Sequence, residues 1–217
     1  MIPTQNEADR VEHAIESARA AGVEIIVVDG GSRDATRERA VAAGARVLNV
    51  APGRARQLEA GAQATQADAI LFLHADTTLS PGWADALRGA LADPRVVGGA
   101  FGFRFAESGF SLRVVEWGVR VRLALAGLPY GDQALFARRS ALEAIGGVPQ
   151  APIGEDVDLV RALRRHGRLA LLPLPALTSG RRYLEHGVFR TVARNTLALA
   201  AFALGLDRAR VAAWYRR

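Results

Sequence analysis

The chain reads Ala69-Ile70-Leu71-Phe72-Leu73-His74-Ala75-Asp76 and continues with Thr77, Thr78 and the pair Pro81-Gly82. Apolar residues that run together and stop abruptly at polar ones are typical of a strand buried on both faces. In open α/β proteins, ligands bind at the carboxyl ends of such strands. Asp76 is therefore a candidate metal or substrate ligand, although an Asp followed by Thr and Pro also caps turns. This stretch alone leaves both roles open.

Strands and helices alternate on either side of this stretch. We predict strands at 2–4, 24–28, 45–50 and 69–73, and helices at 6–21, 35–43, 54–64 and 83–91. Alternation at this spacing indicates βαβ units, and so an α/β fold with a mostly parallel central sheet and helices on both faces. Because the first strand is very short, we expect its edge to be frayed.

The second half of the chain is less regular. It predicts strands at 96–105, 134–137 and 169–172, and helices at 112–125, 139–145 and 156–166. With no repeat or low-complexity linker between the halves, we predict one Rossmann-like nucleotide-binding domain over residues 1–188. Residues 189–217 are predicted to form a helical segment that packs on this domain, on a partner subunit or on a membrane surface.

Composition excludes several classes of protein. The sequence contains no cysteine, which rules out disulfides and thiolate metal sites. Arginine supplies all 28 basic residues, and the net charge is +6. Such a chain is suited to bind phosphate groups or anionic lipid. Only 6% of residues are aromatic, so nucleic acid is not an expected partner. Without a secretory or membrane-spanning pattern, we expect a cytoplasmic protein, at the inner face of the membrane if the last helix binds lipid.

Two further acidic segments are candidates for a site. Glu155 and Asp156 follow Gly154 and begin a predicted helix, where carboxylates either favour the helix dipole or serve as a general base. Asp29 ends another predicted strand and precedes Gly30, in a loop whose glycines allow close approach of a ligand. A Gly-x-Gly-x-x-Gly fingerprint is absent after the first strands, so the dinucleotide interpretation is not supported.

Two pairs of arginines are candidates for binding an anion. Arg54 and Arg56 begin a predicted helix, where the dipole disfavours cations and a bound diphosphate would compensate. Arg181 and Arg182 form a second pair late in the chain. Ordinary solvated arginine is the alternative for both pairs.

Taken in order, these segments resemble the family 2 glycosyltransferases, which have the GT-A fold. The resemblance rests on residues 2–7, on Val27 to Thr36 with Asp29 and Gly30, on Phe72 to Asp76 in the place of an Asp-x-Asp motif, and on Gly154-Glu155-Asp156 in the place of a Glu-Asp motif. Residues 53–57, 73–77, 131–133 and 178–183 are further similar to a short bacterial subgroup labelled for arsenosugar biosynthesis or as radical-SAM and selenium-domain associated. Such labels leave the acceptor open.

The resemblance implies an inverting transfer of a sugar from a nucleoside diphosphate to an acceptor hydroxyl. It implies Asp156 as general base, with Glu155 orienting either Asp156 or the acceptor, and Asp76 as the ligand of Mn²⁺ or Mg²⁺. His74 departs from the motif and either adds a nitrogen ligand or hydrogen-bonds at the sheet edge. The implied nucleotide and donor contacts are Pro3, Thr4, Asn6, Glu7, Asp29, Gly30, Arg54, Arg56, Ala75, Asp132, Arg181 and Arg182.

The expected partners are a nucleoside-diphosphate sugar, a UDP-sugar first among them, and a small-molecule or lipid acceptor. The last helix could also pack against a second copy of the chain in a homodimer, or bind peripherally to a membrane. Two other functions stay open at this point. One is a nucleotidyltransferase of similar fold, and the other is a non-catalytic module that binds anions or a membrane surface.

Overall fold

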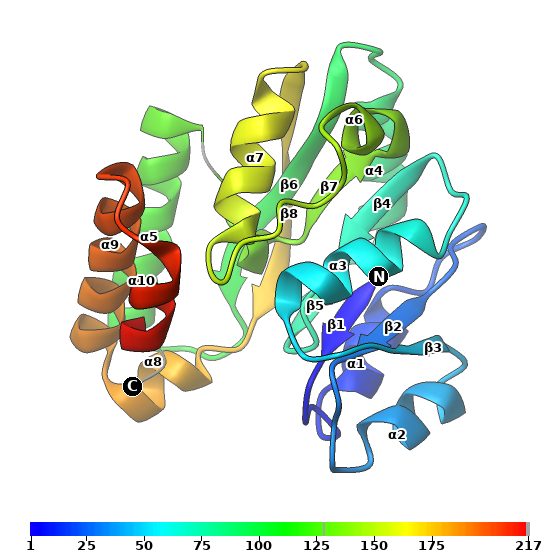
Figure 1. Cartoon of the computed structure of the whole chain (residues 1–217), viewed down its shortest axis with the longest axis horizontal. Coiled ribbons are helices and arrows are strands. Elements are labelled where there is room, and N and C mark those ends of the chain that lie inside the picture. The colour runs from blue at the N-terminus through cyan, green and yellow to red at the C-terminus, as the bar shows by residue number, and fades with distance from the viewer. Residues whose placement is uncertain (128, 216–217) are drawn as a thin grey trace.

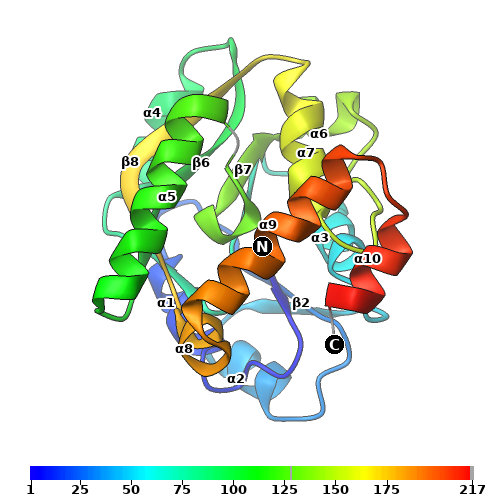
Figure 2. The same cartoon turned by 90° about the vertical axis from the view of Figure 1, so that its left-hand side faces the viewer.

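The computed structural model describes residues 1–127 and 129–215, so residues 216 and 217 of the predicted C-terminal segment lie outside it. Figures 1 and 2 show the arrangement of the elements. In chain order these are β1 (Ile2–Thr4), α1 (Val11–Ser17), β2 (Ile26–Asp29), α2 (Thr36–Ala42), β3 (Arg46–Asn49), α3 (Arg54–Gln63), β4 (Ala69–Phe72), β5 (Thr77–Leu79), α4 (Trp83–Leu91), β6 (Val96–Phe105), α5 (Phe110–Ala126), η1 (Gly131–Gln133), β7 (Leu135–Arg138), α6 (Arg139–Ala144), α7 (Glu155–Arg164), β8 (Arg168–Thr178), α8 (Arg181–His186), α9 (Val188–Ala203) and α10 (Arg208–Tyr215).

The strands form a parallel three-stranded sheet, β1-β2-β3, and a mixed five-stranded sheet in the order β4-β7-β6-β8-β5. The predicted α/β class is confirmed, but the sheet is less parallel than expected, because only β6 and β8 run parallel in the second sheet. The backbone carbonyl of Asp132 accepts a hydrogen bond from Thr178 at the end of β8. The turn η1 therefore lies at the end of the sheet where β6 finishes. Strand β7 starts from that end and runs back along β6, so the two strands are antiparallel.

The first strand joins the two sheets. The Met1 amino group donates to the carbonyl of Leu71 at 2.6 Å, and the N–H of Leu73 donates back to the Met1 carbonyl at 3.0 Å. Ile2 is only 1% exposed. The expectation of a frayed first edge is therefore wrong, because β1 lies between β2 and β4. The carboxyl ends of β2 and β4 consequently lie on the same side of the protein.

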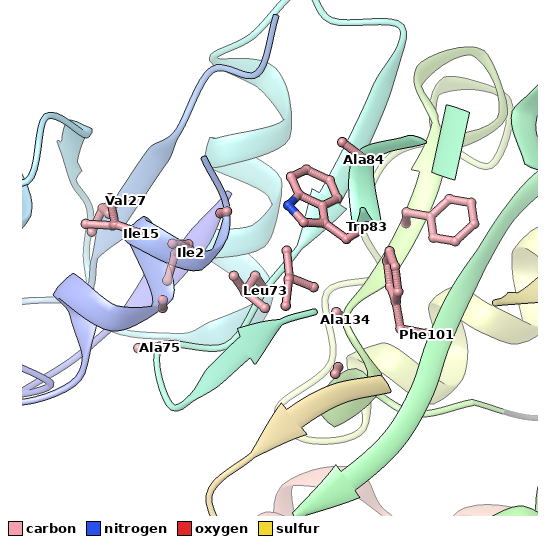
Figure 3. Packing of buried hydrophobic residues seen from close by; sticks show 14 of the residues in the cluster. Ile2, Ile15, Val27, Leu73, Ala75, Trp83, Ala84, Phe101 and Ala134 are labelled. Carbon is pink, nitrogen blue, oxygen red and sulfur yellow. The ribbon is translucent and has the colours of Figure 1, made fainter. Parts of the chain in front are cut away.

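Helices cover both faces of the sheets, as predicted. On one face, α1, α2 and α4 bury a cluster that includes Ile15, Leu73, Trp83 and Phe101 (Figure 3). On the other face, α3, α6 and α7 bury a second cluster around Leu58 and Leu159. Burial of apolar surface on both sides stabilises the strands by roughly 25 cal/mol per Å² and fixes where their polar ends lie.

Several element boundaries differ from those predicted. Helix α1 begins at Val11 rather than at residue 6, because Asn6 has a left-handed φ of 57° and the N–H of Glu7 donates to the Thr36 hydroxyl at 2.9 Å. Strand β8 is longer than predicted and contains Pro173 and Pro175, which lie at a register shift against β6, where proline is tolerated. Two short elements, β5 and α8, were not predicted, and the segment predicted to be helical over residues 189–217 contains two helices, α9 and α10.

Candidate functional site

The site lies where the ends of β4 and β8, the turn η1 and the start of α7 meet. The Ser179 N–H donates to the carbonyl of Asp76 at 3.0 Å. The hydroxyls of Thr77 and Thr178 are 2.8 Å apart, and Thr178 also donates to the Asp132 carbonyl at 2.9 Å. These bonds fasten the β4–β5 turn, the end of β8 and η1 to one another, so Asp76 and Asp132 are held at a common edge.

Gly131 is the centre around which four predicted site residues gather. Its N–H donates to Oδ2 of Asp156 at 2.7 Å. The guanidinium of Arg54 pairs with Oε1 of Glu155 at 2.8 Å and donates to Nε2 of His74. A methyl group on Gly131 would lie 2.8 Å from Arg54, 2.9 Å from Asp156 and 3.0 Å from His74. Only glycine leaves room for these side chains in this arrangement, and the sequence pointed to position 131 only through the resemblance of residues 131–133 to the bacterial subgroup.

The His74 ring is neutral. Burial, reinforced by the nearby Arg54 and Arg182, holds the pKa of His74 well below its usual value. Because Nε2 accepts from Arg54, the ring proton lies on Nδ1, which is 4.0 Å from Oδ1 of Asp76. Neither ring nitrogen then has a free lone pair for a cation. This arrangement favours the predicted hydrogen-bonding role of His74 over that of a metal ligand.

The cation-binding capacity of this edge rests on Asp76. Its side chain is 28% exposed, and its described side-chain bond is a long one, 3.4 Å from the Thr77 hydroxyl. Among residues 1–127 and 129–215, no group of three or more acidic or histidine side chains could hold a metal ion. Mg²⁺ and related ions are commonly held by one or two carboxylates together with substrate phosphates and water. The edge therefore fits a cation that arrives with a diphosphate.

The predicted nucleotide loop is organised by Asp29, whose side chain is fully buried. Oδ2 of Asp29 accepts from the N–H groups of Gly31 at 2.9 Å and Ser32 at 2.8 Å, and Oδ1 accepts from the Ser32 hydroxyl. The Asp29 carboxylate thus shapes the loop in which Gly30 lies. Gln57, which the sequence did not single out, donates from below to the backbone carbonyls of Thr4 and Val28, each at 2.8 Å.

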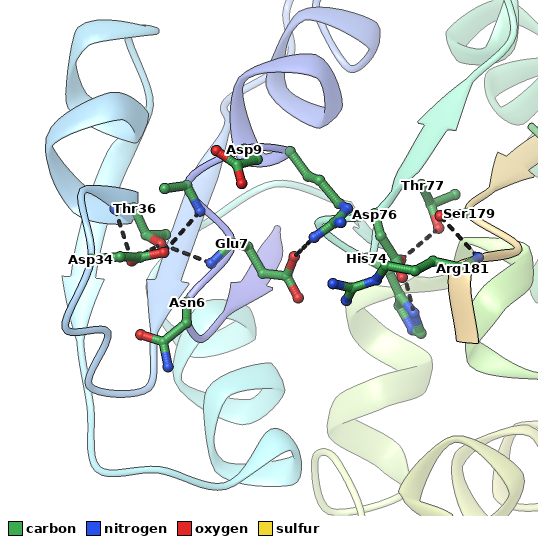
Figure 4. A network of polar contacts seen from close by, with 12 residues as sticks. Asn6, Glu7, Asp9, Asp34, Thr36, His74, Asp76, Thr77, Ser179 and Arg181 are labelled. Atoms are coloured by element: carbon green, nitrogen blue, oxygen red, sulfur yellow. Dashed lines mark hydrogen bonds and ion pairs between the residues drawn. The ribbon is translucent and has the colours of Figure 1, made fainter. Parts of the chain in front are cut away.

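Asn6 and Glu7 face the site from the opposite side of the same edge (Figure 4). The side-chain oxygen of Asn6 accepts from the N–H of Arg33 at 2.9 Å. The Glu7 carboxylate pairs with Arg10 at 3.2 Å. Burial raises the pKa of Glu7, Asp76 adds to this rise, and Arg10 and Arg181 oppose it. Glu7 therefore lies across the site from Asp76 and Arg181, and Asn6 stands beside Glu7, bonded to Arg33.

Asp132 carries a buried acceptor atom without a hydrogen-bond partner in the described part of the chain, Oδ1. Burial raises the pKa of Asp132 to about 6, against the attraction of Arg122. Its neighbour Gln133 is fully buried and donates to the Phe101 carbonyl at 3.0 Å. A buried polar atom without a partner costs free energy, and a hydroxyl group placed beside Oδ1 of Asp132 would offset this cost.

The model of the family described as "Glycosyl transferase family 2" matches residues 1–142. The chain belongs to this family. It is an α/β protein of the GT-A type, and the matched residues include Asp29, Asp76 and η1 but end before Glu155 and Asp156.

Among related family 2 proteins are the glucosyl-3-phosphoglycerate synthases of Mycobacterium tuberculosis and Mycobacterium bovis. Each is 35% identical to this chain over 89 residues, which is 35% of this chain and 28% of the relative. The chain thus spans less than a third of the curated relatives it matches. A solved structure of the M. tuberculosis synthase, in complex with Mn²⁺, UDP-glucose and phosphoglyceric acid, is 25% identical with a TM-score of 0.66. The match covers 95% of this chain and 79% of that one.

The remaining arginines of this family 2 protein differ in their placement. Arg182 lies close enough to lower the pKa of His74, and Arg181 close enough to lower that of Glu7. Arg56 is exposed and donates to the backbone carbonyl of Pro52, on the loop before α3, at 3.2 Å. The structure thus brings Arg181 and Arg182 toward the site, together with Arg54, whereas the bond described for Arg56 is local.

The C-terminal helices brace the start of α7. Arg208 pairs with Asp158 at 2.8 Å and donates to the Ile153 carbonyl at 3.0 Å. Its guanidinium also lies 3.8 Å from the ring centre of Phe202. Gly154 adopts a left-handed φ of 75° against Arg208 and Phe202. The segment that presents Glu155 and Asp156 is therefore held from outside the sheet, by residues of α9 and α10.

Proposed function

We propose that this family 2 glycosyltransferase moves a sugar from a nucleoside diphosphate to an acceptor hydroxyl, with metal assistance and inversion at the anomeric carbon. The observation that carries this proposal is the convergence on Gly131 of a carboxylate, Asp156, with the cationic Arg54, beside the edge that carries Asp76. A sugar transfer of this kind needs a base for the acceptor and positive charge for the departing diphosphate.

The proposed donor is a UDP-sugar. Solved structures of the M. tuberculosis synthase hold UDP with Mg²⁺, or UDP-glucose with Mn²⁺. In this chain the loop shaped by Asp29, with Gly30, Asn6 and Glu7 around it, is proposed to receive the base and ribose. Pro3 and Thr4 are proposed to lie beneath the bound nucleotide. The backbone of Ala75, between His74 and Asp76, is proposed to lie close to the diphosphate.

The residues at the sheet edge fit a divalent cation bound with the diphosphate. Asp76 would hold the ion, and the ion would supply positive charge that stabilises the leaving diphosphate. Arg54 is oriented toward the same place by the buried carboxylate of Glu155, which is 7% exposed and 2.8 Å away. Glu155 is thus proposed as a positioning residue. Arg181 and Arg182 are proposed to add further positive charge.

Asp156 is the proposed general base. Its Oδ2 accepts the Gly131 N–H at 2.7 Å, and its Oδ1 accepts the Val157 N–H at 2.9 Å. A carboxylate oxygen has two lone pairs, so each oxygen of Asp156 can still accept the proton of an acceptor hydroxyl. The two backbone bonds fix the direction of the carboxylate. Asp132 is proposed to bind a hydroxyl of the transferred sugar through its unpartnered Oδ1.

The acceptor is proposed to be a hydroxyl compound, either a small molecule or a lipid. The transferase domain is proposed to comprise residues 1–188, with residues 189–217 as the helical segment that packs on it. The narrower resemblance to the arsenosugar-labelled subgroup is part of this proposal and is supported by the segment Gly131-Asp132-Gln133, whose glycine lies at the centre of the site.

A thermal-shift screen of nucleoside diphosphates and their sugars, with and without Mn²⁺, tests this proposal. We expect stabilisation that needs both nucleotide and metal, followed by slow release of nucleoside diphosphate from one sugar nucleotide. Asp85→Asn, which changes a carboxylate that is 88% exposed on α4, is the matched control for variants of the site acids. If no nucleoside diphosphate shifts the melting temperature with Mn²⁺, the chain is a binding module rather than a transferase.

A further inference from the structure

Helix α5 turns an apolar stripe toward solvent. Its inner face packs Leu112 and Val119 against β6. On the opposite face, Phe110 is 87% exposed, Trp117 is 65% exposed and Leu125 is 84% exposed. Phe110, Val114, Trp117 and Leu125 are separated by four, three and eight residues, which are about one, one and two helical turns and place them on one side of the helix. A solvated helix of a soluble domain normally shows polar residues there.

Helix α9 repeats this arrangement. Ala198 and Phe202 face inward and pack against Val211 of α10. On the outward side Phe189 is 89% exposed, Leu197 is 59% exposed and Leu204 is 77% exposed. Between Phe189 and Leu204 this outward side carries no charged residue other than Arg190 at its margin. The stripe extends along the whole helix.

The two stripes lie on the same side of the protein. Helices α5 and α9 contact each other, and Figures 1 and 2 both place them in one layer with α8 and α10. Of the thirteen exposed large hydrophobic side chains in the described residues, eleven belong to this layer. They are Phe110, Val114, Trp117, Leu125, Leu184, Phe189, Val192, Leu197, Leu204, Leu206 and Trp214. We call this surface the helical face.

The charges around the helical face are mainly positive. Exposed arginines stand beside the apolar stripes at 113, 120, 190 and 210. The one acid of α5, Glu116, is buried and accepts from the Phe105 N–H, and the described residues of α9 and α10 contain no acid. Glu185 on α8 and Asp207 between α9 and α10 are the nearby exposed acids. A second copy of this chain would bring arginines against arginines in a symmetric contact, which opposes a dimer.

We infer that the helical face docks on the surface of a lipid bilayer that contains anionic lipid. An apolar helix face with Trp and Phe, bordered by arginine, is suited to the boundary between headgroups and acyl chains. Among the described residues no helix is long and apolar enough to cross a membrane, so the contact is with one leaflet. Helix α8 begins just after Ser179 and Gly180, beside Asp76, so the docked face adjoins the site.

Co-sedimentation with vesicles tests this inference without any nucleotide, so its result is separate from that of the transferase proposal. We expect at least about tenfold more binding to vesicles that contain phosphatidylglycerol than to phosphatidylcholine vesicles, and weaker binding at high salt because counter-ions screen the arginines. The variant Trp117→Glu/Phe189→Glu should lose this binding. Both side chains are exposed, so the melting temperature should stay unchanged.

Val41→Glu is the matched control. Val41 is 60% exposed on α2, away from the helical face, and the change introduces one negative charge at an exposed apolar side chain, against two in the double variant. It should leave vesicle binding intact. Equal binding of the wild type to both kinds of vesicle, or no binding to either, would overturn the inference. So would light scattering that shows a dimer which the Trp117→Glu/Phe189→Glu variant dissociates, because the occupant would then be a second copy.

Discussion

The backbone N–H of Gly131 and the carboxylate of Asp156 are joined by a 2.7 Å hydrogen bond across 25 residues of sequence. This bond ties the turn after α5 to the first turn of α7. Charge-assisted bonds to a carboxylate are among the stronger ones in proteins, so the direction of the Asp156 side chain is set before any substrate arrives. Preorganisation of this kind is what a general base requires.

Gly131→Ala should lower turnover by about a hundredfold, because misplacing a reacting group by about 1 Å has an effect of that size. The new methyl group would lie within 3.0 Å of Arg54, Asp156 and His74 and would push them apart. Steady-state kinetics would measure the loss. Gly89→Ala on α4 is the control, since nothing lies within 4 Å of its added methyl group. Equal turnover of the two variants would contradict the assigned centre.

Asp156→Asn should reduce transfer by about two to four orders of magnitude while nucleotide binding stays measurable. The amide keeps an oxygen for only one of the two backbone N–H groups, and it cannot take up the acceptor proton. Asp85→Asn is the control, because it changes a carboxylate that is 88% exposed on α4. Near-normal turnover of Asp156→Asn would remove Asp156 from the role of base.

Asp76→Asn should abolish the part of the thermal shift that depends on Mn²⁺ in the presence of UDP, because Asp76 is the proposed cation ligand. His74→Gln should keep that part, since a glutamine oxygen can still accept from Arg54 and the imidazole is not needed as a ligand. Differential scanning fluorimetry with a Mn²⁺ titration separates the two. Loss of the metal dependence in His74→Gln would instead make His74 a ligand.

Asp132→Asn should stabilise the ligand-free protein at pH 8 and leave its stability at pH 4 nearly unchanged. The pKa of Asp132 rises from 3.8 to about 6 on folding. The folded state therefore favours the protonated form, and stability is lost as the pH rises through about 6. The neutral amide escapes this loss, which is at most about 3 kcal/mol. Urea unfolding at both pH values measures the difference, and a gain that is equal at pH 4 would contradict this origin.

Arg208→Ala should lower turnover more than it weakens nucleotide binding, because Arg208 holds the segment before Glu155 and touches no wall of the nucleotide loop. We expect an unfolding free energy lower by about 1 to 2 kcal/mol from the lost ion pair and ring contact. Arg210→Ala, an exposed arginine on the same helix, is the control for charge. A rise in KM for the donor with unchanged kcat would argue against this positioning role.

Much of the scaffold could be predicted from hydrophobic periodicity. The helices at α2, α3 and α4 and the strand β6 lie within a residue or so of the predicted ranges. Strand β5 has three residues and β8 contains two prolines, so neither carries a clear periodic signal. The antiparallel direction of β7 depends on the end of the sheet from which the strand starts. Hydrophobic periodicity carries no information about that direction.

The site was predictable where polar residues follow buried strands and was not where contacts span the chain. Asp76, Glu155 and Asp156 stand at element boundaries and were identified on that basis. The role of Gly131 depends on three side chains from other elements, and Gln57 reads as an ordinary polar residue on a helix. Asp29 was found by its position, but its bonds to its own loop follow from a backbone shape that no local pattern encodes.

The contacts of Arg208 with Ile153 and Asp158 have a practical consequence for protein engineering. Acceptor preference in a transferase is usually altered by changing residues that line the pocket. Here the direction of Asp156, the proposed base, depends in addition on Phe202 of α9 and Arg208 of α10. Mutant libraries restricted to the pocket would miss this adjustment, whereas libraries that vary Phe202 and Arg208 would sample it.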